Sequence, residues 1–334
     1  MTNDQTINTK YVDPFGRSID YVRLSVTDRC DLRCFYCMPK GYKEFEEPTD
    51  WLTFDEIERV ISAFASLGIK NVRITGGEPL VRKNLSDLTT RLSKVSGVED
   101  MSLSTNAVKL AKHAQALYES GVQRLNVSLD CVDADKFKQI TGGGKLEKVI
   151  AGLMAAKKAG FSPIKINMVL MRGINDDEVF NMIDFCAEHN FVLRLIETMP
   201  MGITGKEATQ RYIPLDKIKE QIAKRYEMVP AVMRGAGPAR YMSIPEINLK
   251  IGFITPISQH FCGTCNRVRM GVNGTLYLCL GQEHQYPLRE ILRNGVTDEE
   301  LKQHLIKALA LKPEKHEFKE KPDNIIRIMS ATGG

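Results

Sequence analysis

Six of the eight cysteines fall into two groups of three, with spacings typical of metal ligands. The groups are Cys30, Cys34 and Cys37, spaced C-x3-C-x2-C, and Cys262, Cys265 and Cys279, spaced C-x2-C-x13-C. Thiolates at such spacings bind zinc or iron–sulfur clusters. Each group offers three ligands, one fewer than a closed zinc site or an ordinary [4Fe–4S] cluster uses.

Two interpretations of the first group follow from its three ligands. It could be a zinc site that a distant fourth ligand completes, for example one from the second group. It could instead hold a [4Fe–4S] cluster in which one iron stays open for another ligand. The second interpretation explains the missing ligand, because the open iron is then a binding position. Cys131 and Cys186 stand alone, and we expect both to be small buried apolar residues.

Two arginines follow the first two cysteines of the second group, in the stretch CNRVR. If this stretch is a strand, Arg267 and Arg269 share one face, because side chains alternate along a strand. That face could simply be solvated. Two guanidinium groups beside an open iron fit better as a clamp for an anion, since arginine pairs with phosphate oxygens in a bidentate manner.

Strand and helix signals alternate up to about residue 205. Short β-branched runs predict strands at 21–26, 71–75, 100–104, 123–128, 164–170 and 192–196. Helical patterns lie at 53–67, 108–120, 145–159 and 177–189. The alternation predicts parallel β/α units, either in an open doubly wound sheet or in a complete or partial (β/α) barrel. In either fold, functional groups gather where the strands end.

The segments after the expected strands agree with that rule. The first cysteine group follows the first strand and GGEP, at 76–79, follows the second. Beyond about residue 205 the alternation fades into a helix at 214–226 and shorter β-like pieces, with Asn273-Gly274 as a hairpin turn. We expect this region to close one side of the sheet or barrel.

Composition and charge exclude some classes of protein. The chain has 334 residues and a net charge of +5, too small an excess to indicate a nucleic-acid coat. The first ten residues carry no secretory signal, and no apolar run reaches the roughly 18 residues of a membrane span. We therefore expect a cytoplasmic protein that binds neither nucleic acid nor membrane.

The first cysteine motif, with an aromatic residue before its last cysteine, resembles the radical S-adenosylmethionine (radical SAM) superfamily. GGEP, one β/α unit later, is similar to its second motif. CxxCNRxR with a distant third cysteine resembles the GTP 3′,8-cyclase family of molybdenum cofactor biosynthesis, as do ITGGEPL, VSLD, KINMV, LRLIETMPMG and a terminal Gly-Gly. The resemblance covers roughly residues 14–334.

The resemblance implies an α/β fold, a partial (β/α)6 TIM-like barrel with a C-terminal α+β extension that closes its open side. It implies a flexible N-terminal arm over 1–16, a barrel core over 17–205 and a C-terminal domain over 206–334 with a second cluster and the Gly-Gly tail. Cys30, Cys34 and Cys37 would hold a [4Fe–4S] cluster that binds SAM. Cys262, Cys265 and Cys279 would hold a second [4Fe–4S] cluster, whose open iron meets the guanine of GTP.

The resemblance also assigns residues to the two small molecules. The expected SAM contacts are Tyr36, Gly76, Gly77, Glu78, Ser128 and Met199. The expected GTP contacts are Arg23, Arg73, Ser104, Lys165, Arg194, Arg267, Val268 and Arg269. The expected catalytic residues are Arg267, Arg269, Gly333 and Gly334, the two glycines in a tail that reaches into the active site. A frayed end is the alternative for such a tail.

The implied reaction is the first step of molybdenum cofactor biosynthesis. A 5′-deoxyadenosyl radical from SAM takes the ribose 3′ hydrogen of GTP, and closure onto C8 gives 3′,8-cyclo-7,8-dihydro-GTP. The implied partners are a reductant protein such as flavodoxin or ferredoxin, the following pyranopterin-forming enzyme, and a second copy of the chain in a homodimer. MGVNG after the arginines, Ser104 and the SATGG tail depart from the family's usual residues.

Two other classes of protein compete with this interpretation. A radical SAM enzyme that modifies peptides would typically carry more C-terminal cysteines than the three present. A zinc-stabilised nucleic-acid-binding module would need a basic stripe, which the modest net charge does not favour.

Overall fold

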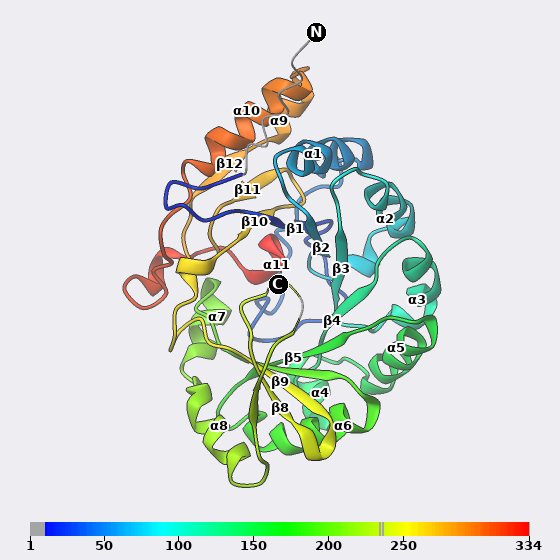
Figure 1. The fold of residues 1–334 in the computed structure, drawn as a ribbon, viewed down its shortest axis with the longest axis vertical. Helices are drawn as coiled ribbons and strands as arrows, with labels where there is room; N and C mark the ends of the chain where they lie inside the picture. The colour runs from blue at the N-terminus through cyan, green and yellow to red at the C-terminus, as the bar shows by residue number, and fades with distance from the viewer. Residues whose placement is uncertain (1–10, 234, 236, 334) are drawn as a thin grey trace.

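The computed structural model describes residues 11–233, 235 and 237–333. Its strands form a single curved sheet that is not closed into a barrel. The sheet order is β12-β11-β10-β1-β2-β3-β4-β5-β6-β9-β8-β7. Figure 1 shows the strands as an open ring, with helices such as α1, α2, α3, α5 and α6 along its outside.

All six expected strands are present within a residue or two of their predicted ends. They are β1 (Tyr21–Ser25), β2 (Asn71–Thr75), β3 (Asp100–Thr105), β4 (Arg124–Ser128), β5 (Ile164–Leu170) and β6 (Val192–Glu197). Neighbouring strands in this set are all parallel. The prediction of parallel β/α units is therefore confirmed.

The C-terminal region extends this sheet at both of its edges. Its strands are β7 (Val229–Ala231), β8 (Arg240–Ile244), β9 (Leu249–Ile254), β10 (Arg267–Met270), β11 (Thr275–Tyr277) and β12 (Gln285–Pro287). β9 pairs parallel with β6, and β10 pairs parallel with β1. The fold is a partial TIM-like barrel, but the expected C-terminal extension continues the sheet at both edges, because β9 and β10 have the direction of the core strands.

The helices of the core lie between its strands in sequence. They are α1 (Phe54–Ser66), α2 (Leu85–Ser93), α3 (Leu110–Glu119), α4 (Ala134–Ile140), α5 (Leu146–Ala159) and α6 (Val179–His189). A capping box begins α1: the Thr53 side chain accepts from the N–H of Glu56, and the Glu56 carboxylate accepts from the N–H of Thr53. Ile57, Val60, Ile61 and Phe64 of α1 are fully buried against the sheet.

Helices also follow β6 and close the chain. They are α7 (Gly202–Thr209), α8 (Leu215–Ala223), α9 (Arg289–Arg293), α10 (Asp298–Leu309) and α11 (Met329–Thr332). The expected helix at 214–226 is α8, and the expected turn at Asn273-Gly274 joins β10 to the antiparallel β11. No helix of the described residues is long and apolar enough to cross a membrane.

The division of the chain into an arm, a core and a C-terminal domain stays a prediction. Residues 1–10 of the expected arm lie outside the described residues. Tyr11 is buried, and its hydroxyl donates to the carbonyl of Leu305 at 2.7 Å. The first described residue is thus fixed to α10.

Candidate active site

Three arginines stand side by side on the inner face of the sheet. Arg269 on β10 is in register with Arg23 on β1, and Arg23 is in register with Arg73 on β2. Partners in register on parallel strands point to the same face, so the three side chains leave the sheet together. Like charges at such positions repel one another and destabilise a sheet unless an anion compensates them.

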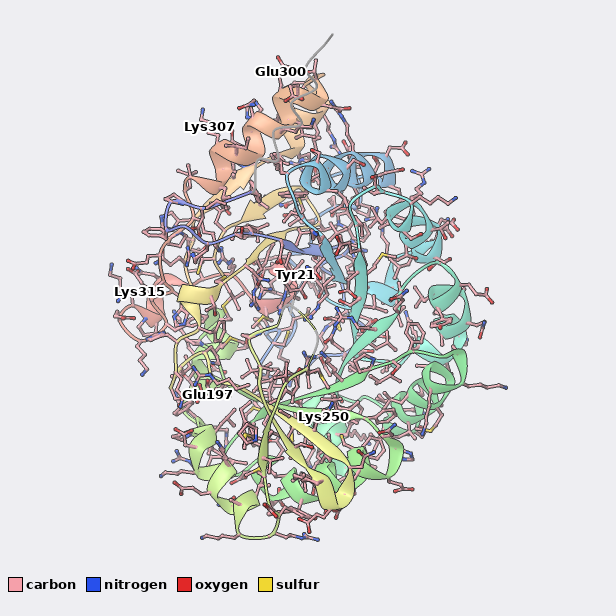
Figure 2. All side chains as sticks on the ribbon, viewed as in Figure 1. Tyr21, Glu197, Lys250, Glu300, Lys307 and Lys315 are labelled. Carbon is pink, nitrogen blue, oxygen red and sulfur yellow. The ribbon has the colours of Figure 1, made fainter. Side chains whose placement is uncertain are left out.

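The same face carries further cations. Besides Arg23, Arg73 and Arg269 they include Lys165, Arg194 and Arg267, whereas Arg124 on the same face is paired with Asp100. Burial lowers the pKa of Arg73, Arg194, Arg267 and Arg269, and the charge of Arg23 lowers each further. Tyr21 lies among them, where the guanidinium groups of Arg73 and Arg23 lower its pKa although burial alone would raise it. In Figure 2, Tyr21 is labelled near the centre of the ring of strands.

Several of these cations carry donor atoms without an acceptor among the described residues. Among the described residues, the buried Nε atoms of Arg23, Arg194 and Arg267 have no hydrogen-bond acceptor. Buried donors are almost always satisfied in native proteins, so orphaned ones indicate a missing ligand. Burial together with the charge of Arg194 lowers the pKa of Lys165 to about 7. The arrangement fits a polyanion.

Two other expected GTP contacts, Ser104 and Val268, lie on strands of the same sheet. Ser104 of β3 is half-buried, in register with Asn126 of β4. The side chain of Val268 points the other way from its arginine neighbours and packs in the hydrophobic core. Only the backbone of Val268 is left to contact a ligand.

The first cysteine group lies in the loop after β1. Burial raises the pKa of Cys30, Cys34 and Cys37, and charge on Cys37 raises the pKa of the other two further. The three thiols therefore lie close together, and all eight cysteines of the chain are free of disulfides. Cys131 and Cys186 are fully buried, as expected.

The GGEP turn packs directly on that loop. The N–H of Gly77 donates to the carbonyl of Thr27 at 2.7 Å, and the N–H of Glu78 donates to that of Arg29 at 2.8 Å. A Cβ on Gly76 would lie 2.4 Å from the Thr27 oxygen, and one on Gly77 would lie 2.5 Å from the Arg29 oxygen. Glycine is required at both positions because backbone meets backbone.

The Glu78 carboxylate is fully buried and is satisfied by the protein itself. It accepts from the Thr105 hydroxyl at 2.7 Å, from the N–H of Asn106 at 2.6 Å and from the N–H of Leu80 at 3.1 Å. Burial raises its pKa to about 7. We expected Glu78 to contact SAM, and the structure places its carboxylate where it ties the turn to the end of β3. Asn106, which we did not predict, donates to Asp31 at 2.8 Å beside the cysteines.

The remaining expected SAM contacts surround this loop. The Tyr36 hydroxyl donates at 2.7 Å to Asp130, whose other oxygen accepts from the N–H of Val169. Burial raises the pKa of Asp130 to about 6. Ser128 is exposed at the end of β4, and Met199 is half-buried after β6. Asp130 is a second residue that sequence reasoning missed, although it closes the stretch VSLD.

The second cysteine group forms around the start of β10 and the end of β11. The ammonium of Lys312 opposes the effect of burial on the pKa of all three thiols. Arg17 donates to the carbonyl of Cys262 at 2.9 Å. His260 and His316 lie next to Cys262, with ligand atoms of the three residues within 4.8 Å of one another. Because Cys262 is shared, the two histidines border the second cysteine group.

The C-terminal tail lies between the two cysteine groups. α11 is drawn at the centre of the ring of strands in Figure 1. Arg269 donates to the carbonyl of Gly333, and a Cβ on Gly333 would lie 2.3 Å from the Thr75 side chain. The N–H of Ser330 lowers the pKa of Cys37, which burial raises. Gly334 lies outside the described residues.

One arginine anchors this tail to the second cysteine group. Arg327 donates to the carbonyl of Cys279 at 2.8 Å and to that of Leu280 at 2.9 Å. It also forms an ion pair with Glu283 at 3.1 Å and stacks over Tyr277. Sequence reasoning did not identify Arg327, because its partners lie more than forty positions away.

Comparison with known proteins identifies the family. Residues 24–186 match the family described as Radical SAM superfamily, and residues 191–318 match Molybdenum Cofactor Synthesis C. A "GTP 3′,8-cyclase" of Hydrogenovibrio crunogenus is 47% identical over 328 residues, 97% of this chain and 99% of the relative. The chain belongs to the GTP 3′,8-cyclase family. A member of the family from Marinobacter nauticus is 44% identical over 98% of this chain and 99% of its own length.

Solved structures agree with the cyclase family's fold. SuiB of Streptococcus suis, in a structure bound to S-adenosylmethionine, aligns over 94% of this chain and 77% of its own, with a TM-score of 0.58 and 16% identity. SuiB bound to the precursor peptide SuiA gives the same TM-score at 15% identity, over 87% and 64% of the two chains. These likenesses show a shared fold.

Membership of the radical SAM superfamily implies one [4Fe–4S] cluster and SAM. The residues of the chain fit that cluster, because three half-buried thiols converge in a loop that Gly76 and Gly77 hold by close backbone contact. The prediction of a radical SAM enzyme of molybdenum cofactor biosynthesis is confirmed.

Proposed function

We propose that the chain uses SAM to cyclise GTP to 3′,8-cyclo-7,8-dihydro-GTP, the first step of molybdenum cofactor biosynthesis. One observation carries this proposal: six cations on the inner face of the sheet lie between two groups of three cysteines. A group that binds SAM, a site for a polyanion and a second metal site are the three parts that the reaction needs.

Cys30, Cys34 and Cys37 hold the first cluster in this proposal, and the turn at Gly76 and Gly77 lies against their loop. Close packing on that loop fixes the turn, whose backbone carbonyl groups can accept from a ligand's amino group. Tyr36, oriented by Asp130, and Ser128 and Met199 border the position of SAM. The cluster and SAM, when bound, supply the radical that takes the ribose 3′ hydrogen.

The cations bind the triphosphate and orient the ribose. Arg23, Arg73 and Arg269 present adjacent guanidinium groups, and each can pair with phosphate oxygens in a bidentate manner. Lys165 and Arg194 reach the same face from β5 and β6. Fixing the nucleotide from several strands holds the ribose against the radical, where a small displacement costs rate steeply.

We further propose that Cys262, Cys265 and Cys279 hold a second [4Fe–4S] cluster, whose open iron meets the guanine. The tail contributes by covering the site. Thr332 is fully buried, and Gly333 lies against Arg269 and Thr75. The tail thereby excludes water from the region between the two cysteine groups, which protects a radical from side reactions.

The partners belong to this proposal too. An electron-transfer protein such as flavodoxin or ferredoxin supplies electrons, and the following pyranopterin-forming enzyme takes the product. A homodimer is expected from the family resemblance.

An anaerobic assay tests the proposal. The reconstituted protein is expected to bind about eight irons, four for each cluster, and to yield 5′-deoxyadenosine and the cyclised nucleotide from SAM, GTP and a reductant. Cys265→Ala is expected to retain about four irons and SAM cleavage but to form no cyclised product. Full cyclisation by Cys265→Ala would reject the second cluster. Cleavage of SAM by the unaltered protein, with GTP left unconverted, would reject GTP as the substrate.

A further inference from the structure

Lys312 joins the two segments that carry the second cysteine group. Its side chain is 4% exposed, and its Nζ donates to the carbonyl of Arg267 at 3.0 Å and to that of Leu278. Arg267 follows Cys265 by two residues, and Leu278 directly precedes Cys279. One ammonium group therefore holds the backbones beside two of the three cysteines.

This buried ammonium has no carboxylate partner. Among the residues that the structure describes, Lys312 forms no ion pair, whereas nearby Arg17 is paired with Asp13 at 2.5 Å. An unpaired buried charge is costly, so such groups are normally compensated by an opposite charge. The three cysteines are the anionic groups available to Lys312.

We propose that Lys312 is the fixed counter-charge of the second [4Fe–4S] cluster and stabilises its reduced state. This inference rests on the second cluster of the proposed function. A [4Fe–4S]²⁺ core with three thiolates carries one net negative charge, and one electron from a low-potential reductant makes it two. A buried positive charge favours the more negative state, so Lys312 raises the midpoint potential of the cluster.

Redox titration followed by electron paramagnetic resonance tests this role. The full-length protein, Lys312→Met and Lys312→Arg are reconstituted anaerobically, and iron is counted before titration with dithionite. The same variants in a Cys34→Ala background give the second cluster's signal alone. Lys315→Met is the control, because Lys315 lies on the same segment but is exposed and pairs with Glu320 (Figure 2).

Lys312→Met is expected to keep the iron of the second site, and its second cluster should have a lower midpoint potential. In Lys312→Arg and Lys315→Met the midpoint potential should stay close to that of the unaltered protein. Loss of that iron in Lys312→Met alone, with iron and potential kept in Lys312→Arg, would also support a role of charge. An unchanged potential in fully loaded Lys312→Met would overturn the role of Lys312, as would iron loss in both variants. Absence of a second cluster from the unaltered protein would instead remove the proposed function's second site and this inference with it.

Discussion

Arg267 enters the candidate GTP site from β10, and its Nε has no acceptor among the described residues although it is buried. Its guanidinium lies over Tyr21 and Phe261, at 5.9 Å from each ring centroid. The aromatic rings hold the charged group in place while its Nε–H has no acceptor among the described residues. A side chain held in this way is ready to bind an anion without further ordering.

Arg267→Ala is expected to weaken GTP binding roughly tenfold or more, because a hydrogen bond to a charged group contributes about 1.5–3 kcal/mol. The iron content should stay unchanged, since the side chain is not a ligand. Calorimetric titration with GTP measures the affinity. Arg91→Ala is the matched control, because Arg91 is an exposed arginine on the outer helix α2. Loss of iron in Arg267→Ala would contradict its role as an anion clamp.

The lowered pKa of Lys165 leads us to expect that GTP binding depends on pH. Its pKa is lowered to about 7 by burial and by Arg194, so in the protein without nucleotide the Lys165 ammonium loses its proton as the pH rises through about 7. A bound triphosphate favours the ammonium form and raises this pKa. Affinity should therefore be highest below about pH 7 and fall as the pH rises, with proton uptake on binding.

Titrations from about pH 6 to about pH 9, in buffers with different heats of ionisation, measure that uptake. Lys165→Arg keeps the charge at every pH and should flatten the profile. The same pH profile in Lys165→Arg as in the unaltered protein would assign the effect to another group.

The site was predictable where residues are close in sequence. Three motifs indicate their chemistry from residues only a few positions apart: the cysteine spacings, GGEP and the two alternating arginines. Lys312, Arg327 and Asp130 act through partners between 34 and 94 positions away. Only the fold brings those groups together, so a single sequence does not reveal them.

The turn at Gly77 positions the first cysteine loop as a unit. Unlike Gly76, Gly77 does not need a left-handed backbone, so its requirement for glycine is one of space alone. Gly77→Ala would force the Arg29 carbonyl away and cost about 1–3 kcal/mol of stability by overpacking.

The displaced loop should also bind SAM and iron more weakly in Gly77→Ala. Iron analysis and SAM titration check this. Gly68→Ala is the control, because Gly68 has a left-handed backbone at the end of α1 but open space around its Cα. The Gly68→Ala variant should lose about 1 kcal/mol of stability but should keep its iron. Equal iron loss in both variants would show that instability, not the loop, is responsible.

The strands of the core and four of its helices were predictable because each has its own local signal. α1 has a capping box and an apolar face, and the six strands are short β-branched runs. The sequence analysis missed α2 and α4 in the core and α7, α9, α10 and α11 beyond it. The pairing of β9 and β10 with opposite edges of the core depends on contacts between residues far apart in the chain. The periodicity of apolar residues gives no information about such contacts.

At the scale of the molecule, the C-terminal region belongs to the sheet. β10 covers the edge of β1 and β9 covers the edge of β6. A fragment of residues 17–205 would leave both edges unpaired, together with apolar side chains that now pack against the C-terminal strands.

We expect that fragment to aggregate or to lack fixed tertiary structure. Such a result would argue against a division of the chain into an independently folding core and a separate C-terminal domain. Size-exclusion chromatography and near-ultraviolet circular dichroism would measure this, with the full chain as the control. A monomeric fragment with a cooperative unfolding transition would show that the core folds by itself.

The position of Gly333 has a practical consequence. Arg269 holds its carbonyl and Thr75 fills the space beside it, inside the ring of strands. An affinity tag or fluorescent fusion appended to this end would have to pass out through the interior that the nucleotide needs. The opposite terminus is the safer place for such a handle, and a loss of turnover seen only with a C-terminal fusion would report on the tail and not on the purity of the preparation.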